Sequence, residues 1–409
     1  MTGVLDRLVI LDLTRFLSGP YCTLLLAGLG AEVIKIDDPK HGDPTANAPP
    51  FAGPNGINFQ RQSDTDLGLA YLKRARGKQS TTLDLKHEDG HAIFMRLVES
   101  ADVVVDNFRP GVAARLGIDY PALAARNPRI ITCSITGYGS TGPDRDLKSY
   151  DLMAQAASGL MGITGEPAGP PMKIATAFSD MNSGAYAALA ILAAVEERAH
   201  SGRGQAAEVS MVDCLFAMMM DEPLDCYERL GLEMRQGNRI MRFSPFNAYR
   251  SQDGWVVLGA ATDVEWRGLT AAIEREDLTS HPEFGQVDWR LRHNAAVDEL
   301  VQAWAMDRTT ADIIATLGAH DVPCAPVRSP QQALAWGQLK DRGMVAPLRQ
   351  PDGSDTSAVA AGLPFQFSRS SVGHREPAPL PGSGTRAVLQ RFLDASDEQL
   401  ARWEQDGVI

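Results

Sequence analysis

A single acid, Asp180, follows a stretch of chain that cannot form regular structure. Between Gly165 and Pro171 the sequence holds two glycines and three prolines, which exclude a helix or an interior strand and predict a loop with restricted dihedrals. The small residues at 185–195 then predict a helix that packs tightly. A carboxylate held by a stiff loop near a helix N-terminus can attack an activated carbonyl. Asp180 is therefore a candidate nucleophile.

A structural role for Asp180 competes with the chemical one. Aspartate before an alanine-rich helix is a favoured N-cap, because its carboxylate accepts the unpaired N–H groups of the first turn. The residues taken alone favour this cap. At this point both roles stay open, and both require the predicted helix.

The charge balance and the cysteines exclude several classes of protein. The 409 residues include 39 lysines and arginines against 51 acidic residues, a net charge of -12, which argues against non-specific binding to nucleic acid or anionic membranes. No signal pattern and no apolar run of membrane-spanning length occur, so we expect a cytoplasmic protein. Five scattered cysteines predict neither a disulfide framework nor a metal site.

The first part of the chain alternates between two kinds of segment. Branched apolar runs predict strands at residues 8–13, 31–36, 81–85, 103–105 and 130–135, and helices are predicted at 24–27, 90–99 and 121–126. This alternation predicts an α/β fold with a doubly wound parallel sheet. Ligands of such sheets bind at the carboxyl ends of the strands. Neither Gly-x-Gly-x-x-Gly nor a P-loop occurs, so no motif supports a dinucleotide or nucleoside triphosphate.

The pattern of predicted strands and helices changes near residue 241. Residues 247–258 predict two strands joined by an Asp-Gly turn, and helices are predicted around 264–273, 290–306 and 309–317. We therefore expect a large domain made of residues 1–200 and 325–409, linker helices at 201–240, and a smaller α+β domain at 241–324 inserted between them.

Seven short segments follow one another in a characteristic order. They are LDL at 11–13 with GP at 19–20, VIKI at 33–36, LDLK at 83–86, NFRPG at 107–111, GYG at 137–139, SDMNSG at 179–184 and GRGQ at 202–205. This set resembles the class III CoA-transferases, the group of the formyl-CoA and carnitine CoA-transferases. α-Methylacyl-CoA racemases are relatives of the same group. The resemblance spans nearly the whole chain, and the order of the segments makes it specific.

The resemblance implies an activity and an assembly. It implies that CoA moves from an acyl-CoA donor to a small carboxylic acid through an aspartyl anhydride and an aspartyl-CoA thioester, with Asp180 as the nucleophile. CoA is then a substrate, and no metal or permanently bound cofactor is required. The implied fold is a large Rossmann-like domain with a small domain inserted, in a homodimer whose two chains interlock.

The resemblance also implies which residues contact CoA. Carried over position by position, they are Leu17, Ser18, Leu83, Lys86, Asn107, Phe108, Arg109, Arg115, Lys148 and Tyr150. The chain departs from the formyl-CoA transferases at Asp38, where they carry an arginine, and Lys40 is the candidate replacement. Their glycine-rich lid is also absent, since only Gln236, Gly237 and Asn238 lie in that region.

Two other functions remain as alternatives. An acyl-CoA racemase of this fold uses a histidine and an aspartate, and Tyr150 stands at the place of that histidine, so the resemblance favours transfer. A CoA-binding protein without catalysis would use Asp180 only as a cap. Candidate oxyanion donors are Asn182 and Ser183 or the loop 137–142. The basic residues Arg235, Arg239 and Arg242 indicate a dicarboxylic acid.

Overall fold

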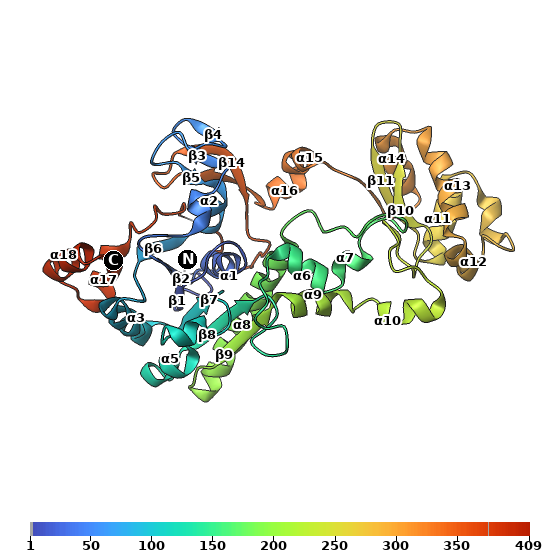
Figure 1. The fold of residues 1–409 in the computed structure, drawn as a ribbon. Coiled ribbons are helices and arrows are strands. Elements are labelled where there is room, and N and C mark those ends of the chain that lie inside the picture. Colours follow the sequence, from blue (N-terminus) through green and yellow to red (C-terminus); the bar gives the residue numbers. More distant parts are fainter. Residues whose placement is uncertain (1–2, 375) are drawn as a thin grey trace. The chain divides into compact units, whose positions relative to one another are not determined.

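The chain folds into two compact units, seen in Figure 1. The computed structural model describes residues 3–374 and 376–409. The first unit runs from the N-terminus to Leu160 and includes Ile174–Asp221 and Gly337–Ile409. The second unit comprises Met161–Lys173 and Glu222–Trp336. Among the helices of the described residues, none has the length and apolarity that crossing a bilayer requires.

The elements keep one numbering in the text and in Figure 1. The strands are β1 Val9–Asp12, β2 Glu32–Asp37, β3 Phe51–Gly53, β4 Gly56–Asn58, β5 Leu67–Gly68, β6 Lys78–Thr82, β7 Val103–Asp106, β8 Ile131–Thr136, β9 Ala206–Ser210, β10 Phe246–Arg250, β11 Trp255–Gly259, β12 Cys324–Pro326, β13 Val345–Arg349 and β14 Asp355–Ala361. The helices are α1 Ser18–Gly28, α2 Leu69–Arg74, α3 Glu88–Ser100, α4 Val112–Arg115, α5 Tyr120–Arg126, α6 Asp151–Ala157, α7 Leu160–Ile163, α8 Phe178–Ser201, α9 Met211–Met219, α10 Leu224–Tyr227, α11 Asp263–Ala272, α12 Val287–Arg292, α13 Asn294–Met306, α14 Thr310–Ala319, α15 Pro330–Ala335, α16 Gly337–Asp341, α17 Thr385–Leu393 and α18 Asp397–Gln405. Three short 3-10 turns lie at Pro44–Asn47, Glu228–Leu230 and Glu276–Ser280.

A six-stranded parallel sheet forms the centre of the first unit. The described strands pair in the order β6-β2-β1-β7-β8-β9, and each neighbouring pair is parallel. Counted along the chain this is the order 3-2-1-4-5-6, that of Rossmann-type sheets. The predicted α/β fold with a parallel sheet is confirmed. The strand order reverses between β1 and β7, so the loops after these two strands diverge at that point.

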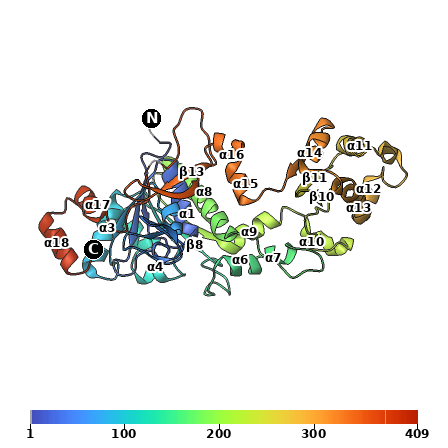
Figure 2. The same ribbon diagram turned by 90° about the horizontal axis from the view of Figure 1, so that it is seen from above.

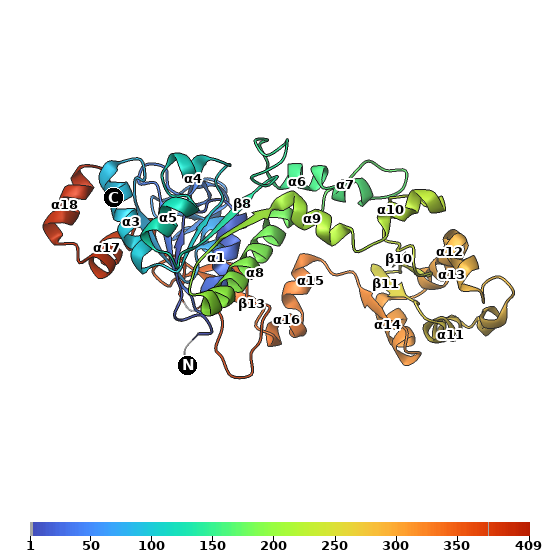
Figure 3. The same ribbon diagram turned by 90° about the horizontal axis from the view of Figure 1, so that it is seen from below.

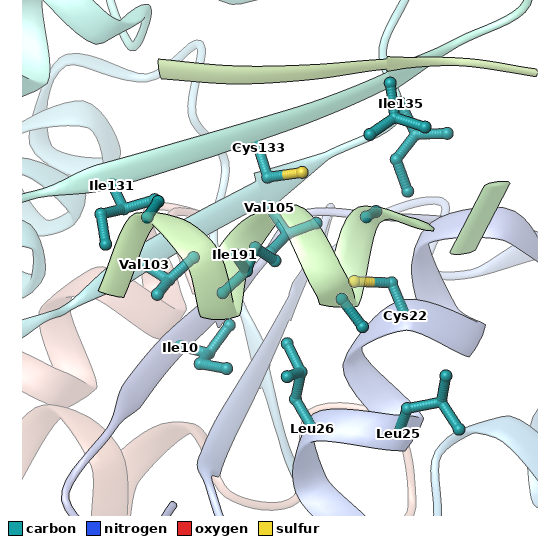
Figure 4. Close-up of a cluster of buried hydrophobic side chains, with 14 of the residues drawn as sticks. Ile10, Cys22, Leu25, Leu26, Val103, Val105, Ile131, Cys133, Ile135 and Ile191 are labelled. Carbon is teal, nitrogen blue, oxygen red and sulfur yellow. The ribbon is translucent and has the colours of Figure 1, made fainter. Parts of the chain in front are cut away.

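One face of the sheet is covered by α1 and α8, which lie side by side in Figure 3. The two strands at the centre of the sheet, β1 and β7, are apolar except for their last residue, because both of their faces are buried. Figure 4 shows the side chains that fill the space between sheet and helices, which are Ile10, Cys22, Leu25, Leu26, Val103, Val105, Ile131, Cys133, Ile135 and Ile191.

The opposite face is covered by helices from both ends of the chain. α3 and α5 pack there together with α17 and α18, and Figure 2 shows α3 beside the two C-terminal helices. Phe94 of α3 and Leu389 of α17 are fully buried in this second core. The first unit is therefore built from both ends of the chain.

Two predicted elements begin at the wrong residue. The strand expected at 81–85 is β6, Lys78–Thr82, and it ends earlier because the backbone N–H of Asp84 leaves the sheet to bond the carbonyl of Val408. The helix expected from residue 185 begins at Phe178, because Asp151 accepts a hydrogen bond from the backbone N–H of Ser179 at 2.8 Å. A side chain from another element thus starts the helix where the local sequence gives no signal.

The second unit has its own core. β10, β11 and β12 form an antiparallel sheet, and the predicted hairpin at 247–258 is confirmed as β10 and β11. Trp266, Leu269 and Val301 from α11 and α13 are buried in this core. The expected small domain, 241–324, lies inside this unit, and the expected linker segment, 201–240, is divided between the two units.

A glycine inside α8 allows α1 and α8 to touch. A Cβ atom at Gly184 would lie 2.5 Å from the carbonyl oxygen of Ser18 and 3.2 Å from the backbone nitrogen of Cys22. Both of these atoms belong to the backbone of α1, so neither can move aside alone. The two helices therefore cross at a distance that only glycine permits.

The variant Gly184→Ala tests this contact. We expect the added methyl group to force α1 and α8 apart and to lower the free energy of unfolding by about 1–3 kcal/mol. Urea denaturation followed by circular dichroism measures the difference. Gly318→Ala in α14 is the matched control, because a Cβ atom there meets nothing within 4 Å. Equal stability of Gly184→Ala and the unaltered protein would contradict the close contact.

Candidate active site

A cavity of about 470 Å³ opens where the strand order of the parallel sheet reverses. The loops after β1 and β7 line it, as does the start of α8, and all of its lining belongs to the first unit. Rossmann-type sheets bind their ligands at this position, because loops from neighbouring strands diverge there. The lining includes Phe16, Leu17, Ser18, Thr45, Arg74, Asn107, Phe108, Arg109, Gly137, Arg145, Lys148, Tyr150, Asp151 and Asp180.

Asp180 lies in the first turn of α8 and is not its N-cap. The N-cap is Ala177, which has no side-chain hydrogen bond. The cap is supplied instead by Asp151, whose Oδ1 accepts the N–H of Ser179, while its Oδ2 accepts a hydrogen bond from Gln155 at 2.7 Å. Because another acid caps the helix, the carboxylate of Asp180 is not needed for that task.

Two helix N-termini meet at the carboxyl group of Asp180. Asp180 itself stands in the first turn of α8, and the backbone N–H of Ser18, the first residue of α1, donates a hydrogen bond to its carboxylate. The positive ends of both helix dipoles therefore face this group. These donors stabilise negative charge on an oxygen at this position.

The surroundings nevertheless hold Asp180 less acidic than an ordinary aspartate. Burial is the largest cause, and with the negative charge of Asp151 it raises the pKa of Asp180 to about 6. The charge of Arg74 and the hydrogen bond from Ser18 act in the opposite direction. At neutral pH the group is mostly ionised, yet it is more basic than a carboxylate in water.

A set of buried charges fixes the loop that carries Leu17 and Ser18. Asp12 accepts hydrogen bonds from the backbone N–H of Thr14 at 3.0 Å and from its hydroxyl at 2.5 Å, and Lys78 bonds the same carboxylate at 3.0 Å. Lys35 donates to the carbonyl oxygen of Thr14 at 2.8 Å. Burial opposes the ionisation of Asp12, but the charges of Lys78 and Lys35 and the hydroxyl hydrogen bonds outweigh it and lower its pKa. Side chains on the strands of the sheet thus hold the loop in place at Thr14.

Most of the residues expected at the site do line this cavity. Leu17, Ser18, Asn107, Phe108, Arg109, Lys148 and Tyr150 surround it together with Asp180. Asn107 serves mainly the protein, since its side chain donates to the carbonyl of Arg15 at 2.7 Å and accepts from its N–H at 3.0 Å. Tyr150 is 68% exposed, which leaves the residue accessible to a ligand.

Three expected contact residues lie outside the cavity lining. Leu83 is 1% exposed and packs in the core beneath α3, so its side chain is not accessible. Lys86 and Arg115 are exposed at the surface, Lys86 just before α3 and Arg115 at the end of α4. The Asp38 side chain accepts the backbone N–H groups of Lys40 and His41 and shapes a turn, and Lys40 is exposed outside the lining.

Of the candidate oxyanion donors, some line the cavity and others do not. Gly137 lines the cavity, but the amide of Asn182 donates to the sulfur of Met218 and the hydroxyl of Ser183 donates to the backbone carbonyl of Asp180. Neither Asn182 nor Ser183 belongs to the cavity lining. The N–H of Ser18, which the sequence did not single out as an oxyanion donor, does point at the reactive group.

Arg74 is the functional candidate that sequence reasoning missed. It is the last residue of α2, it lines the cavity, and its charge acts on Asp180. The surrounding sequence holds Lys73, Arg76 and Lys78 as well, and nothing local marks which of these cations reaches a cavity. Only the packing of α2 beside the loop after β1 distinguishes Arg74 from these neighbouring cations.

The three arginines expected to attract a dicarboxylate are engaged elsewhere. Arg239 pairs with Asp298 at 2.7 Å and Arg242 with Glu222 at 2.5 Å, while Arg235 donates to the carbonyl of Pro167. All of these partners belong to the second unit. Within residues 3–374 and 376–409, no three His, Cys, Asp or Glu side chains gather in a manner suited to a metal ion.

Comparison with known proteins decides the family. Residues 5–385 match the sequence profile described as CoA-transferase family III. The chain belongs to CoA-transferase family III. It is therefore an enzyme of the CoA-transferase type, which moves CoA between an acyl-CoA and a carboxylic acid. This outcome favours transfer over racemisation and over binding without catalysis.

Individual relatives of this family III chain cover nearly its whole length. It is 32% identical to the succinate–glutarate CoA-transferase of Agrobacterium fabrum over 94% of each chain. It is 34% identical to the succinyl-CoA:mesaconate CoA-transferase of Haloarcula hispanica, over 97% of this chain and 96% of the relative. A crystal structure of a CAIB/BAIF family protein from Brucella suis covers 96% of this chain and 100% of its own, with a TM-score of 0.81 and 30% identity.

The variant Asp180→Asn tests the electrostatics of the site. An unperturbed aspartate loses its proton near pH 3.8, whereas the folded protein holds the proton of Asp180 up to a pKa of about 6. The folded state binds more protons between these values, so this carboxyl group costs stability as the pH rises through the window. We expect the asparagine variant to exceed the unaltered protein in unfolding free energy by about 1–3 kcal/mol at pH 8, with the gain vanishing near pH 4.

Urea denaturation at pH 4, 6 and 8 measures this difference. Asp64→Asn is the control, because Asp64 is exposed and lies outside the cavity lining, and it should show no such gain. A difference between Asp180→Asn and the unaltered protein that stays constant over the pH range would contradict the proposed burial effect.

Proposed function

We propose that Asp180 is the nucleophile of the CoA transfer and that the cavity at the reversal of strand order holds the thioester. The observation that carries this proposal is a half-buried carboxylate that lines the cavity and lies at two helix N-termini. Burial makes the carboxylate more basic and removes water that would otherwise hydrolyse an anhydride. The neighbouring dipoles stabilise an oxyanion at the same place.

The first half of the reaction loads CoA onto the enzyme. A carboxylate oxygen of Asp180 attacks the thioester carbonyl, the carbon–sulfur bond breaks, and CoA leaves as a thiolate, which produces a mixed anhydride. The thiolate then attacks the Asp180 carbonyl of that anhydride. The donor acid leaves as a carboxylate, and CoA remains as an aspartyl thioester. No proton has to be added or removed in these steps.

The second half runs the same chemistry in reverse. The acceptor carboxylate attacks the aspartyl thioester, CoA thiolate leaves, and a new anhydride forms. The thiolate then attacks the acceptor carbonyl, which gives the new acyl-CoA and restores the Asp180 carboxylate. The N–H of Ser18 is the proposed donor to the aspartyl oxygen, because it is the backbone donor that lowers the pKa of the Asp180 carboxyl group.

We propose that different residues of this cavity bind the different chemical parts of CoA. Arg109 and Lys148 are exposed cations in its lining and suit the phosphates of CoA, while Leu17, Phe108 and Tyr150 offer apolar surface to the pantetheine chain. Asn107 takes part by holding the loop at Arg15. Contact with the nucleotide end of CoA stays a prediction for Lys86, Arg115 and the backbone at Leu83.

Asp180→Ala tests the covalent step. We expect CoA transfer to fall by about 1,000-fold or more, because the variant lacks the group that forms the intermediate. Incubation with an acyl-CoA should add the mass of CoA less one water to the unaltered chain, on the peptide that contains Asp180. The variant should show no such adduct.

Asp64→Ala is the matched control for this experiment, since it removes an exposed carboxylate outside the cavity. It should retain both transfer and adduct. Transfer at an undiminished rate by Asp180→Ala would overturn the assignment of the nucleophile.

We further propose a homodimer with an inserted small domain and interlocked chains, in the cytoplasm. The outer faces of α8 and α9 support self-association, because Leu189 is 61% and Phe216 is 52% exposed, with Tyr186 and Met218 exposed beside them in the sequence. The cysteines are all unpaired, with Cys22, Cys133 and Cys214 buried, which suits a reducing compartment.

The double variant Leu189→Glu with Phe216→Glu tests the dimer. We expect the unaltered protein to have twice the mass of one chain in light scattering, and the variant to show a monomer fraction, because buried unpaired charges destabilise an apolar interface. Val264→Glu, which alters an exposed valine of α11, is the control. A monomeric unaltered protein would contradict the proposed assembly.

A further inference from the structure

Arg74 occupies an unusual electrostatic position in the cavity. Its Nη1 donates to the carbonyl oxygen of Phe16 at 2.7 Å, which holds the guanidinium against the loop after β1. Its charge acts on Asp180 and on Asp43, yet no described carboxylate oxygen lies within 4 Å of it. The guanidinium is thus half-buried and fixed at one nitrogen, while its remaining N–H groups have no ion-pair partner among the described residues.

Asp43 does not neutralise Arg74, because other groups already satisfy it. Lys35 pairs with Asp43 at 3.1 Å, and the backbone N–H and hydroxyl of Thr45 donate to it at 2.9 and 2.8 Å. Asp180 cannot be a permanent partner either, since its carboxylate loses its charge when it becomes an anhydride or a thioester. A cation in this position therefore needs an anion that arrives with the substrate.

The other cations of the cavity are placed differently. Arg109 also lines a neighbouring cavity that contains neither Asp180 nor Arg74. Arg145 lies 3.5 Å from Asp146, and Lys148 is exposed. Of these four cations, Arg74 is the one whose charge acts on Asp180. Arg74 is therefore the cation of this lining that acts on the proposed nucleophile.

We propose that Arg74 binds the free carboxylate of a dicarboxylic acyl group while the other carboxyl group of that acid reacts at Asp180. The planar guanidinium offers parallel N–H donors that match both oxygens of a carboxylate. The assignment rests on the proposed function, and it names the substrate class as short dicarboxylic acids. Arg74 takes the role of dicarboxylate binding that was predicted for Arg235, Arg239 and Arg242.

A competition between two acceptors tests the assignment. Isotope-labelled succinate and butyrate have the same number of carbons, and butyrate carries a methyl group in place of the second carboxylate. Both acceptors draw on the same aspartyl thioester, so the ratio of labelled succinyl-CoA to labelled butyryl-CoA is independent of the donor and of the reactivity of Asp180. Mass spectrometry of the thioesters measures this ratio.

The unaltered enzyme should favour succinate, and Arg74→Met should lower the ratio by about 10- to 100-fold, because it removes a charge-assisted, paired hydrogen bond. Arg74→Lys keeps the charge without the paired geometry and should fall between the two. Lys73→Met is the matched control, because it removes an exposed cation from the same helix outside the cavity lining, and it should leave the ratio unchanged.

The possible outcomes separate this inference from the nucleophile assignment. An unchanged ratio in Arg74→Met with lower rates for both acceptors would overturn it and would leave Arg74 as a charge partner of Asp180. No preference for succinate in the unaltered enzyme would also overturn it, even where the Asp180 adduct forms. If Arg74→Met does not fold, as judged by circular dichroism, Arg74→Gln and Arg74→Lys give the same comparison. Absence of any adduct would refute the proposed function, and this inference with it.

Discussion

The geometry of the site depends on the contact between α1 and α8 at Gly184. Because the two helices touch through backbone atoms, the N–H of Ser18 on α1 reaches the carboxylate of Asp180 on α8. Helices separated by ordinary side chains lie about 8–10 Å apart, a spacing that would take the α1 amide away from the carboxylate. The apolar layer beneath the two helices, with Leu26 and Ile191 fully buried, holds them in this position. A packing feature of the core thus sets the hydrogen bonding of a reactive group.

The buried charges under the loop after β1 serve the same geometry. Asp12 and Lys78 are fully buried, and ions in such an environment cost several kcal/mol unless they are paired and hydrogen-bonded. Here the cost is offset because each polar atom of Thr14 finds a partner, its N–H and hydroxyl at Asp12 and its carbonyl at Lys35. An apolar core could support the sheet equally well, but it could not hold the direction of the loop. The polar network therefore fixes where Ser18, and with it the start of α1, must lie.

The sequence predicted the parallel sheet well, because buried strands such as β1 and β7 are short apolar runs bounded by polar residues. It predicted the start of α8 wrongly, because the residue that caps that helix, Asp151, is distant in sequence. The cavity lining at Leu17, Asn107 and Lys148 followed from motifs of the family. Arg74 did not, since it lies in a run of cations whose exposure depends on tertiary packing. Local patterns thus defined the scaffold, and long-range contacts defined which charges face the reaction.

The raised pKa of Asp180 favours one way of breaking each mixed anhydride in the proposed reaction, the one that leaves CoA on the enzyme. A mixed anhydride can break on either side, and the carboxylate of the stronger acid leaves more readily. Free aliphatic acids have a pKa near that of a glutamate side chain, about 4.3, whereas the pKa of Asp180 is about 6. Attack by CoA thiolate at the aspartyl carbonyl, which expels the free acid, is therefore favoured over the return to donor. Burial of Asp180 and the negative charge of Asp151 thus help to load CoA onto the enzyme, while the hydrogen bond from Ser18 keeps enough of the carboxylate ionised at neutral pH to begin the attack.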